Sequence, residues 1–207
     1  MNNNPSCISL GWNCNTTVYA IQTNLRITKE NGYKTCPFDI CCTNYLGIIE
    51  CIKDNFKYLT DSNYLKIINS PLKTGTIKKN ENLIYHTKYK FIFPHESPGH
   101  FKLYKIQNWE NGKNHFIDND FLLFKERYNK RIINFKEYIN TNNIHFIIAR
   151  HNKDISKLKN IIDITYPKLM YTITIIDPKQ NIGVLKNHYT VMQLNETEIN
   201  NELNIIN

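Results

Sequence analysis

The chain has 207 residues, of which 41% are hydrophobic, 12% aromatic and 21% charged. This balance is typical of a folded globular protein and excludes a chain that is disordered over most of its length. The 26 Lys and Arg against 18 Asp and Glu give a formal net charge of +8, which permits nucleic-acid binding without indicating it.

The sequence also bears on where the protein resides. No apolar run approaches the roughly 20 residues that span a bilayer, and the first residues lack the basic start and apolar stretch of a signal peptide. The abundance of Lys, Asn and Ile is the usage expected of an A+T-rich genome, such as that of a large DNA virus. We therefore expect an intracellular or virion-packaged protein with no membrane association.

The length predicts a single domain over residues 1–195 with an Asn-rich tail over 196–207. Apolar runs bounded by turn residues predict strands, and apolar residues three or four apart predict helices. Strands are predicted at 6–10, 83–86, 89–93, 101–106, 144–149, 171–176 and 189–194. Helices are predicted at 18–27, from 43 or 44 to 58, at 119–140 and at 155–164.

The order of these elements indicates a fold class. Continuous apolar strands that alternate with helices favour a mainly parallel sheet covered by helices on both faces. The strands at 83–86 and 89–93 meet at a short turn and predict a β-hairpin insertion. The sequence of residues 60–81 predicts only a polar connection between the flanking elements. We therefore predict a single-domain α/β fold with a mainly parallel sheet and a β-hairpin insertion.

The six cysteines all lie in the first quarter of the chain. In an intracellular protein they are expected to be thiols rather than disulfides. Structural zinc sites usually combine two closely spaced pairs of ligands, and the spacings here do not match that pattern. We therefore predict neither a bound metal nor another cofactor.

Cys14 has the most distinctive position of the six. It follows a predicted strand and a turn at Gly11, at the start of a helix, where unpaired N–H groups and the helix dipole stabilise an anion. This position predicts a lowered thiol pKa and a nucleophilic cysteine. The same loop can hold a developing oxyanion, so Gly11 and Asn13 are candidate substrate-binding residues. The alternative is that Cys14 is a small core residue.

Three arginines are candidate anion-binding residues. Arg150 ends a predicted strand, and ligands of parallel α/β sheets bind beyond the carboxyl ends of strands. Arg127 and Arg131 are four residues apart and share one face of a predicted helix. The guanidinium group of each forms charge-assisted hydrogen bonds with groups such as a carboxylate or phosphate of a substrate. Alternatively, the two helical arginines are solvated or pair with Glu126 or Glu137.

Four ordered motifs carry a resemblance to a known family. They are ISLGWNC at 8–14, CPFD at 36–39, FIFPH at 91–95 and RYNKRI at 127–132. Together they resemble the DUF1796 family, described as papain-like cysteine peptidases of bacteria and large DNA viruses, over roughly residues 6–150. The resemblance implies a Cys14 nucleophile, a His95 base, Asp39 as the orienting carboxylate, and a peptide or other amide or acyl substrate. It also implies a papain-like α+β architecture as the alternative fold.

The leading hypothesis is therefore a cysteine-dependent hydrolase, peptidase-like or amidase-like, or an acyl transferase, which uses Cys14, His95 and Asp39. Simpler roles stay open, because an Asp after Pro-Phe often closes a local turn and a loop His is often only solvated. A second hypothesis is a transferase acting on a nucleotide-activated or phosphorylated substrate held by the three arginines. A third is a noncatalytic viral interaction protein that uses its basic surface.

Overall fold

The computed structural model describes residues 6–177, except for 12, 75, 76, 105–108, 142 and 151. The predicted domain end at 195, the tail over 196–207 and the strand at 189–194 lie outside the described residues. Within the described part of the chain, no helix has both the length and the apolar character needed to cross a membrane.

Three parallel strands form the first sheet. They are β1 (Ser6–Ser9), β5 (Asn143–Ala149) and β6 (Met170–Ile176), in the order β1-β5-β6. The register pairs Ile8 with Phe146, and Phe146 with Ile173. The central strand β5 is buried over most of its length, which explains its nearly continuous apolar sequence. Because all three strands run in one direction, their carboxyl ends lie at one edge of the sheet.

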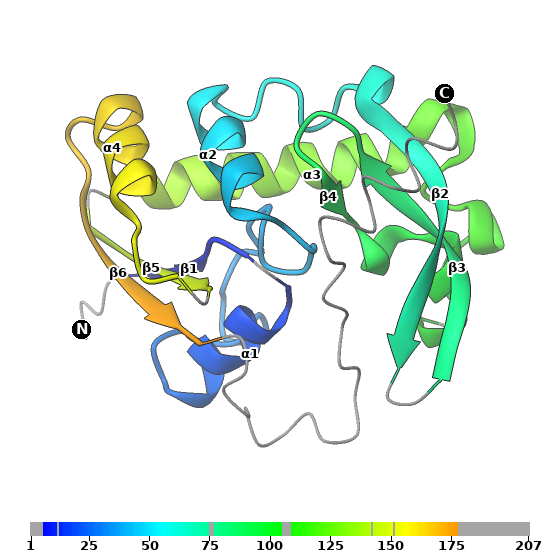
Figure 1. Cartoon of the computed structure of the whole chain (residues 1–207), viewed down its shortest axis with the longest axis horizontal. Helices are drawn as coiled ribbons and strands as arrows, with labels where there is room; N and C mark the ends of the chain where they lie inside the picture. The colour runs from blue at the N-terminus through cyan, green and yellow to red at the C-terminus, as the bar shows by residue number, and fades with distance from the viewer. Residues whose placement is uncertain are drawn as a thin grey trace.

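Helices cover both faces of this sheet (Figure 1). The described residues contain four α-helices: α1 (Asn15–Gln22), α2 (Tyr45–Lys53), α3 (Asp118–Ile139) and α4 (Ser156–Thr165). Ala20 of α1 packs with Cys7 and Ile147 on one face. On the other face Phe135 of α3 lies 6.4 Å from Phe146, between ring centroids, and α4 contributes Leu158 to the same cluster. The predicted α/β arrangement is confirmed.

The second sheet is antiparallel. It contains β2 (Leu65–Thr74), β3 (Ile77–His86) and β4 (Phe91–Ile92) in the order β2-β3-β4. The predicted hairpin is the β3–β4 pair, in which Tyr85 lies opposite Ile92. The expectation of a plain polar connection over 60–81 was wrong, because β2 pairs with β3 along its full length.

In the part of the chain that the structure describes, four short 3-10 helices connect these elements: η1 (Ser62–Tyr64), η2 (Pro94–Glu96), η3 (Pro98–Tyr104) and η4 (Gly112–Asn114). The strand expected at 101–106 was wrong for its first residues, which belong to η3. Gly99 of η3 packs closely on β3, since a Cβ atom there would lie 2.6 Å from the Cβ of Glu81. This close packing holds the chain after η2 against the hairpin.

The two sheets share a hydrophobic core. Phe38 lies between them, with ring centroids 5.9 Å from Phe91 of β4 and 6.3 Å from Phe135 of α3. Cys42, in the segment before α2, forms an antiparallel bridge with Ile92 of β4. The segment 39–43 therefore joins the parallel sheet and the hairpin into a single α/β domain.

Candidate active site

Cys14 lies at the carboxyl edge of the parallel sheet, in the loop between β1 and α1. Gly11 adopts a φ of +93°, which favours glycine, and its N–H donates to Ser9 Oγ at 3.0 Å. Asn13 is 3% exposed, and its Oδ1 accepts from the N–H of Asn15 at 2.8 Å. Cys14 is the N-cap residue of α1, and its side chain makes no capping hydrogen bond. Hydrogen bonds within the loop thus stabilise its backbone, and the Cys14 thiol does not cap the helix.

Burial governs the chemistry of this thiol. Cys14 and Cys42 are half-buried, whereas the other four cysteines are buried. Burial raises the pKa of Cys14 above its ordinary value of 9.0, and a hydrogen bond from its own backbone N–H opposes that rise only in part. The sequence predicted a lowered pKa from the helix N-terminus, and that prediction was wrong. The free protein therefore carries Cys14 as a neutral thiol at neutral pH.

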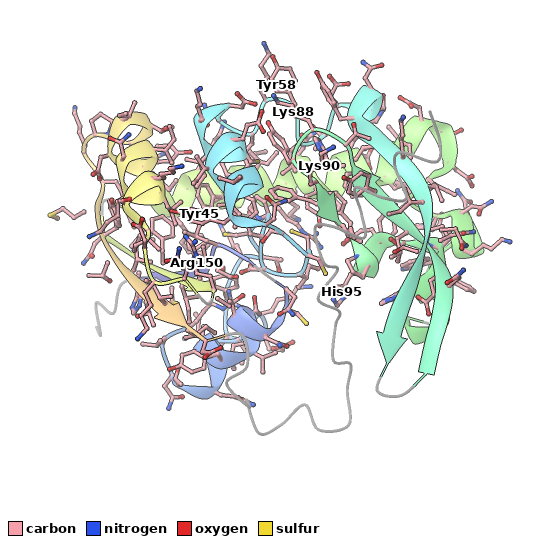
Figure 2. The ribbon with its side chains drawn as sticks, in the orientation of Figure 1. Tyr45, Tyr58, Lys88, Lys90, His95 and Arg150 are labelled. Carbon is pink, nitrogen blue, oxygen red and sulfur yellow. The ribbon has the colours of Figure 1, made fainter. Side chains whose placement is uncertain are left out.

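His95 lies in η2, three residues after the end of the hairpin strand β4. Its side chain is half-buried, and in the view of Figure 2 it lies between the hairpin and α1. Burial lowers the pKa of His95 below 6.5. The Glu96 carboxylate acts in the opposite sense, and the Arg131 and Arg127 guanidinium groups add to the lowering. His95 is therefore mostly neutral at pH 7, the form that accepts a proton.

The segment 41–43 lies between the Cys14 loop and the strand that leads to His95. A Cβ atom on Gly11 would lie 3.0 Å from Thr43 Cβ, so the loop packs on this segment. On the other side, Cys42 N–H donates to Ile92 O at 2.8 Å and Ile92 N–H donates back at 2.9 Å. Burial raises the pKa of Cys42 to about 12, with a contribution from the nearby Cys14. The Cys14 loop and the strand that leads to His95 thus both contact the segment 41–43.

Asp39 is buried in a network of its own. Its carboxylate accepts from Arg26 Nη1 at 2.7 Å, from the N–H of Cys36 at 2.7 Å and from Tyr33 Oη at 3.0 Å. Its carbonyl oxygen accepts from Thr17 Oγ1, in the first turn of α1, at 2.7 Å. These contacts connect the 36–39 turn to the helix that begins after Cys14. An orienting role of Asp39 toward His95 stays a prediction.

The carboxylate beside His95 in the sequence is Glu96, which is fully buried. Arg131 Nη2 donates to its Oε1 at 2.9 Å and Arg127 Nη1 at 3.2 Å. Both arginines come from α3, so the expectation that they share one face is confirmed. The partner is Glu96, whereas the sequence had offered Glu126 or Glu137 of the same helix.

Arg150 lies elsewhere. It follows β5, and its guanidinium stacks on the ring of Tyr45 at 3.5 Å while Nη1 donates to Asp154 O at 2.6 Å. Figure 2 shows Arg150 and Tyr45 together near α2 and α4, apart from His95. Arg150 therefore has partners other than the Glu96 that holds Arg127 and Arg131, and a single anion site made of all three stays a prediction.

Two other histidines, His86 and His100, make contacts within the fold. His86 is fully buried, and its Nδ1 accepts from the N–H of Tyr89 at 3.1 Å while Nε2 lies 2.9 Å from Tyr58 O. His100 lies 3.1 Å from Glu81 Oε2. Burial lowers the pKa of each to about 4. Among the described residues, no three His, Cys, Asp or Glu side chains gather as a group that could hold a metal ion.

Sequence reasoning missed three residues around this site. Arg26, the partner of Asp39, and Glu96, the partner of the α3 arginines, are ion-pair partners, and Cys42 bridges the two sheets. The signal available for Glu96 was an acidic residue next to the candidate base, together with two arginines on one helix face. Arg26 and Cys42 had no such local signal, since their partners are distant in sequence.

Comparison with known proteins agrees with the motif analysis. A family model described as "Putative papain-like cysteine peptidase (DUF1796)" matches residues 6–181. The chain belongs to this family. The match extends through β6, beyond the part that the motifs covered, so all three strands of the parallel sheet belong to the family's shared region. No curated protein and no solved structure matches the chain.

The Asp39 network generates a prediction about stability. Asp39→Ala leaves the Arg26 guanidinium buried without its partner, and breaking a buried ion pair in this way costs about 3 to 5 kcal/mol. Asp39→Asn keeps an oxygen for the Cys36 N–H, so it should cost less. Glu137→Ala removes an exposed pair with Lys34 and serves as the control, with little expected change. Urea unfolding measures all three, and equal midpoints for Asp39→Ala and Glu137→Ala would contradict the prediction.

A second prediction concerns the reactivity of the thiols. Iodoacetamide at pH 8 should label Cys14 first and Cys42 more slowly, because both are half-buried and the other four are buried. The labelling rate of Cys14 should still be rising at pH 9, since its pKa is raised. Mass-spectrometric peptide mapping after partial labelling measures the order. A rate that levels off below pH 7 would mean that Cys14 is already a thiolate there.

Proposed function

We propose that the protein is a cysteine-dependent hydrolase of peptide, amide or other acyl substrates, with Cys14 as the nucleophile and His95 as the general base. The observation that carries the proposal is that the Cys14 loop packs on Thr43 while the adjacent Cys42 pairs with Ile92, three residues before His95. Membership of a family described as cysteine peptidases supports the general class.

The chemistry follows from the protonation states of the two groups. As Cys14 Sγ bonds to the substrate carbonyl carbon, the thiol proton moves to the neutral imidazole of His95. The tetrahedral intermediate then expels the amine or alcohol, which takes the proton from His95, and leaves a thioester on Cys14. Attack by water releases the acid and regenerates the thiol; an amine or alcohol acceptor in place of water would make the same site an acyl transferase.

The start of α1 supports the developing oxyanion in this scheme. The first N–H groups of a helix have no partner within the helix, and they favour negative charge through the helix dipole. Asp39 contributes by positioning, since its contact with Thr17 holds the first turn of α1 against the 36–39 turn. We assign the loop residues Gly11 and Asn13 to the same task of shaping the substrate site beside Cys14.

The anion-binding transferase has less support, because Arg127 and Arg131 are engaged with Glu96 while Arg150 lies against Tyr45. A phosphate group would have to displace the buried Glu96 to reach Arg131. We therefore retain the hydrolase as the single proposed function.

The experiment uses a 4-nitrophenyl ester and a panel of fluorogenic peptide amides. Cys14→Ala should abolish turnover, and His95→Gln should lower kcat by about 100-fold or more, the usual contribution of a general base. The wild-type protein mixed with ester should show the acyl mass on the Cys14 peptide by mass spectrometry.

Cys42→Ala is the matched control, because it removes the other half-buried thiol and should leave turnover within about twofold. Loss of turnover in Cys42→Ala but not in Cys14→Ala would move the nucleophile to Cys42. Turnover that survives both changes would exclude a cysteine mechanism.

The pH profile gives a further prediction. The active free protein has neutral His95, whose pKa is lowered below 6.5, so kcat/KM should fall only as the pH drops below about 6.5. The pKa of Cys14 is raised above 9.0, so no loss is expected between pH 7 and 9. Measurement of kcat/KM from pH 4.5 to 9 tests this. A decline above pH 8 would instead indicate a thiolate–imidazolium pair in the resting protein.

A further inference from the structure

Glu96 follows His95 directly, and both belong to the short turn η2. The carboxylate of Glu96 is 0% exposed. All of its side-chain partners described here come from α3: Arg131 at 2.9 Å, Arg127 at 3.2 Å and Tyr128 Oη at 3.4 Å. One helix therefore holds the residue next to the proposed base.

The cluster of Glu96, Arg127 and Arg131 carries more positive than negative charge. Burial alone would keep Glu96 protonated, but the charges of Arg131, His95 and Arg127 outweigh burial and hold the pKa of Glu96 below its ordinary value. One carboxylate faces two guanidinium groups, which leaves an excess of positive charge. Arg131 is 7% exposed, and its Nη1 has no hydrogen-bond partner among the described residues.

The turn that carries His95 is also fixed by its backbone. The N–H of Glu96 donates to Phe93 O at 3.2 Å, and Ser97 Oγ donates to the same oxygen at 2.6 Å. Ser97 Oγ accepts in turn from the N–H of Ile84, in β3, at 2.8 Å. His95 is thus held between the hairpin on one side and α3 on the other.

The charged and titratable groups around His95 come from the same cluster. They are Glu96 in its own turn, Arg127 and Arg131 from α3, and His100 from η3. His100 is paired with Glu81 of β3 and is neutral near pH 7, since burial lowers its pKa to about 4. The two arginines are therefore the groups that oppose protonation of His95, and Glu96 is the group that favours it.

We propose that Glu96, clamped by Arg127 and Arg131, is a positioning residue: the cluster fixes the turn that carries His95, and its two guanidinium groups oppose protonation of the imidazole. The inference rests on the function proposed above, because it assigns a task to groups beside the proposed base. Glu96 and the two arginines act through His95 and do not touch the substrate.

The test measures the His95 titration by NMR of the full chain labelled with ¹⁵N-histidine, with a His95→Gln sample to assign the signal. Arg127→Gln removes one positive charge at a side chain that is 32% exposed, so the fold should persist, and the pKa of His95 should rise. Arg127→Lys restores the charge and should return the pKa toward the wild-type value. Lys130→Gln removes the same charge from an exposed position of α3 and should leave the titration unchanged.

Kinetics supply the second readout. Arg127→Gln should move the acid limb of kcat/KM to higher pH in step with the His95 titration, whereas Lys130→Gln should not. Glu96→Gln should lower kcat by about tenfold or more with KM nearly unchanged, because a displaced base loses proton transfer rather than substrate binding. If Glu96→Gln fails to fold, the comparison of Arg127→Gln with Lys130→Gln still tests the effect of the cluster on His95.

The outcomes separate the two proposals. Equal His95 titrations in Arg127→Gln and the wild type would overturn the positioning role, even if Cys14 and His95 prove essential for turnover. A shifted titration without any Cys14-dependent turnover would leave the effect of the cluster on His95 established and would overturn the hydrolase. Identical effects of Arg127→Gln and Lys130→Gln would reduce the cluster to a general charge effect and would also overturn the inference.

Discussion

The backbone bridge between Cys42 and Ile92 is the connection on which the candidate site depends. It joins the segment before α2 to the hairpin strand β4, while the same segment packs against Gly11 at the end of β1. Because backbone hydrogen bonds fix both spacing and direction, the bridge fixes the segment that packs on the Cys14 loop relative to the strand that leads to the His95 turn.

Two buried carboxylates stabilise the parts that this bridge brings together. Asp39 pairs with Arg26 and reaches the first turn of α1, and Glu96 pairs with Arg131 and Arg127 from α3. Removing a carboxylate from water costs several kcal/mol, so each is tolerated only with its arginine in place. The consequence is geometric: the Glu96 pairs link α3 to the turn that carries His95, and the Asp39 pair links the segment after α1 to the 36–39 turn.

Sequence signals predicted the parts of the fold that depend on local pattern. The strand predicted at 144–149 and the helix at 155–164 differ by one residue at most from β5 and α4, because buried strands and amphipathic helices carry their periodicity in their own residues. The strand β2 was missed because it is an edge strand with Lys, Asn, Ser and Pro in its sequence. Its pairing is decided by β3. In the same way the i, i+4 spacing showed that Arg127 and Arg131 share a face, but the partner, Glu96, lies more than thirty residues earlier in the chain.

Burial also explains why the sequence misjudged the thiol of Cys14. A helix N-terminus favours the thiolate by an amount comparable to the effect of a surface charge, whereas removal of a thiolate from water acts against it more strongly. Both Cys14 and His95 are therefore uncharged in the resting protein, while the nearby Glu96 carboxylate is paired with Arg131 and Arg127. Since the thiolate is the reactive form of cysteine, such a site has low intrinsic reactivity toward oxidants. In the proposed mechanism, charge separation between Cys14 and His95 becomes favourable only when a bound carbonyl takes up the negative charge beside the N–H groups of α1. The site then gains its reactivity with the substrate rather than before it.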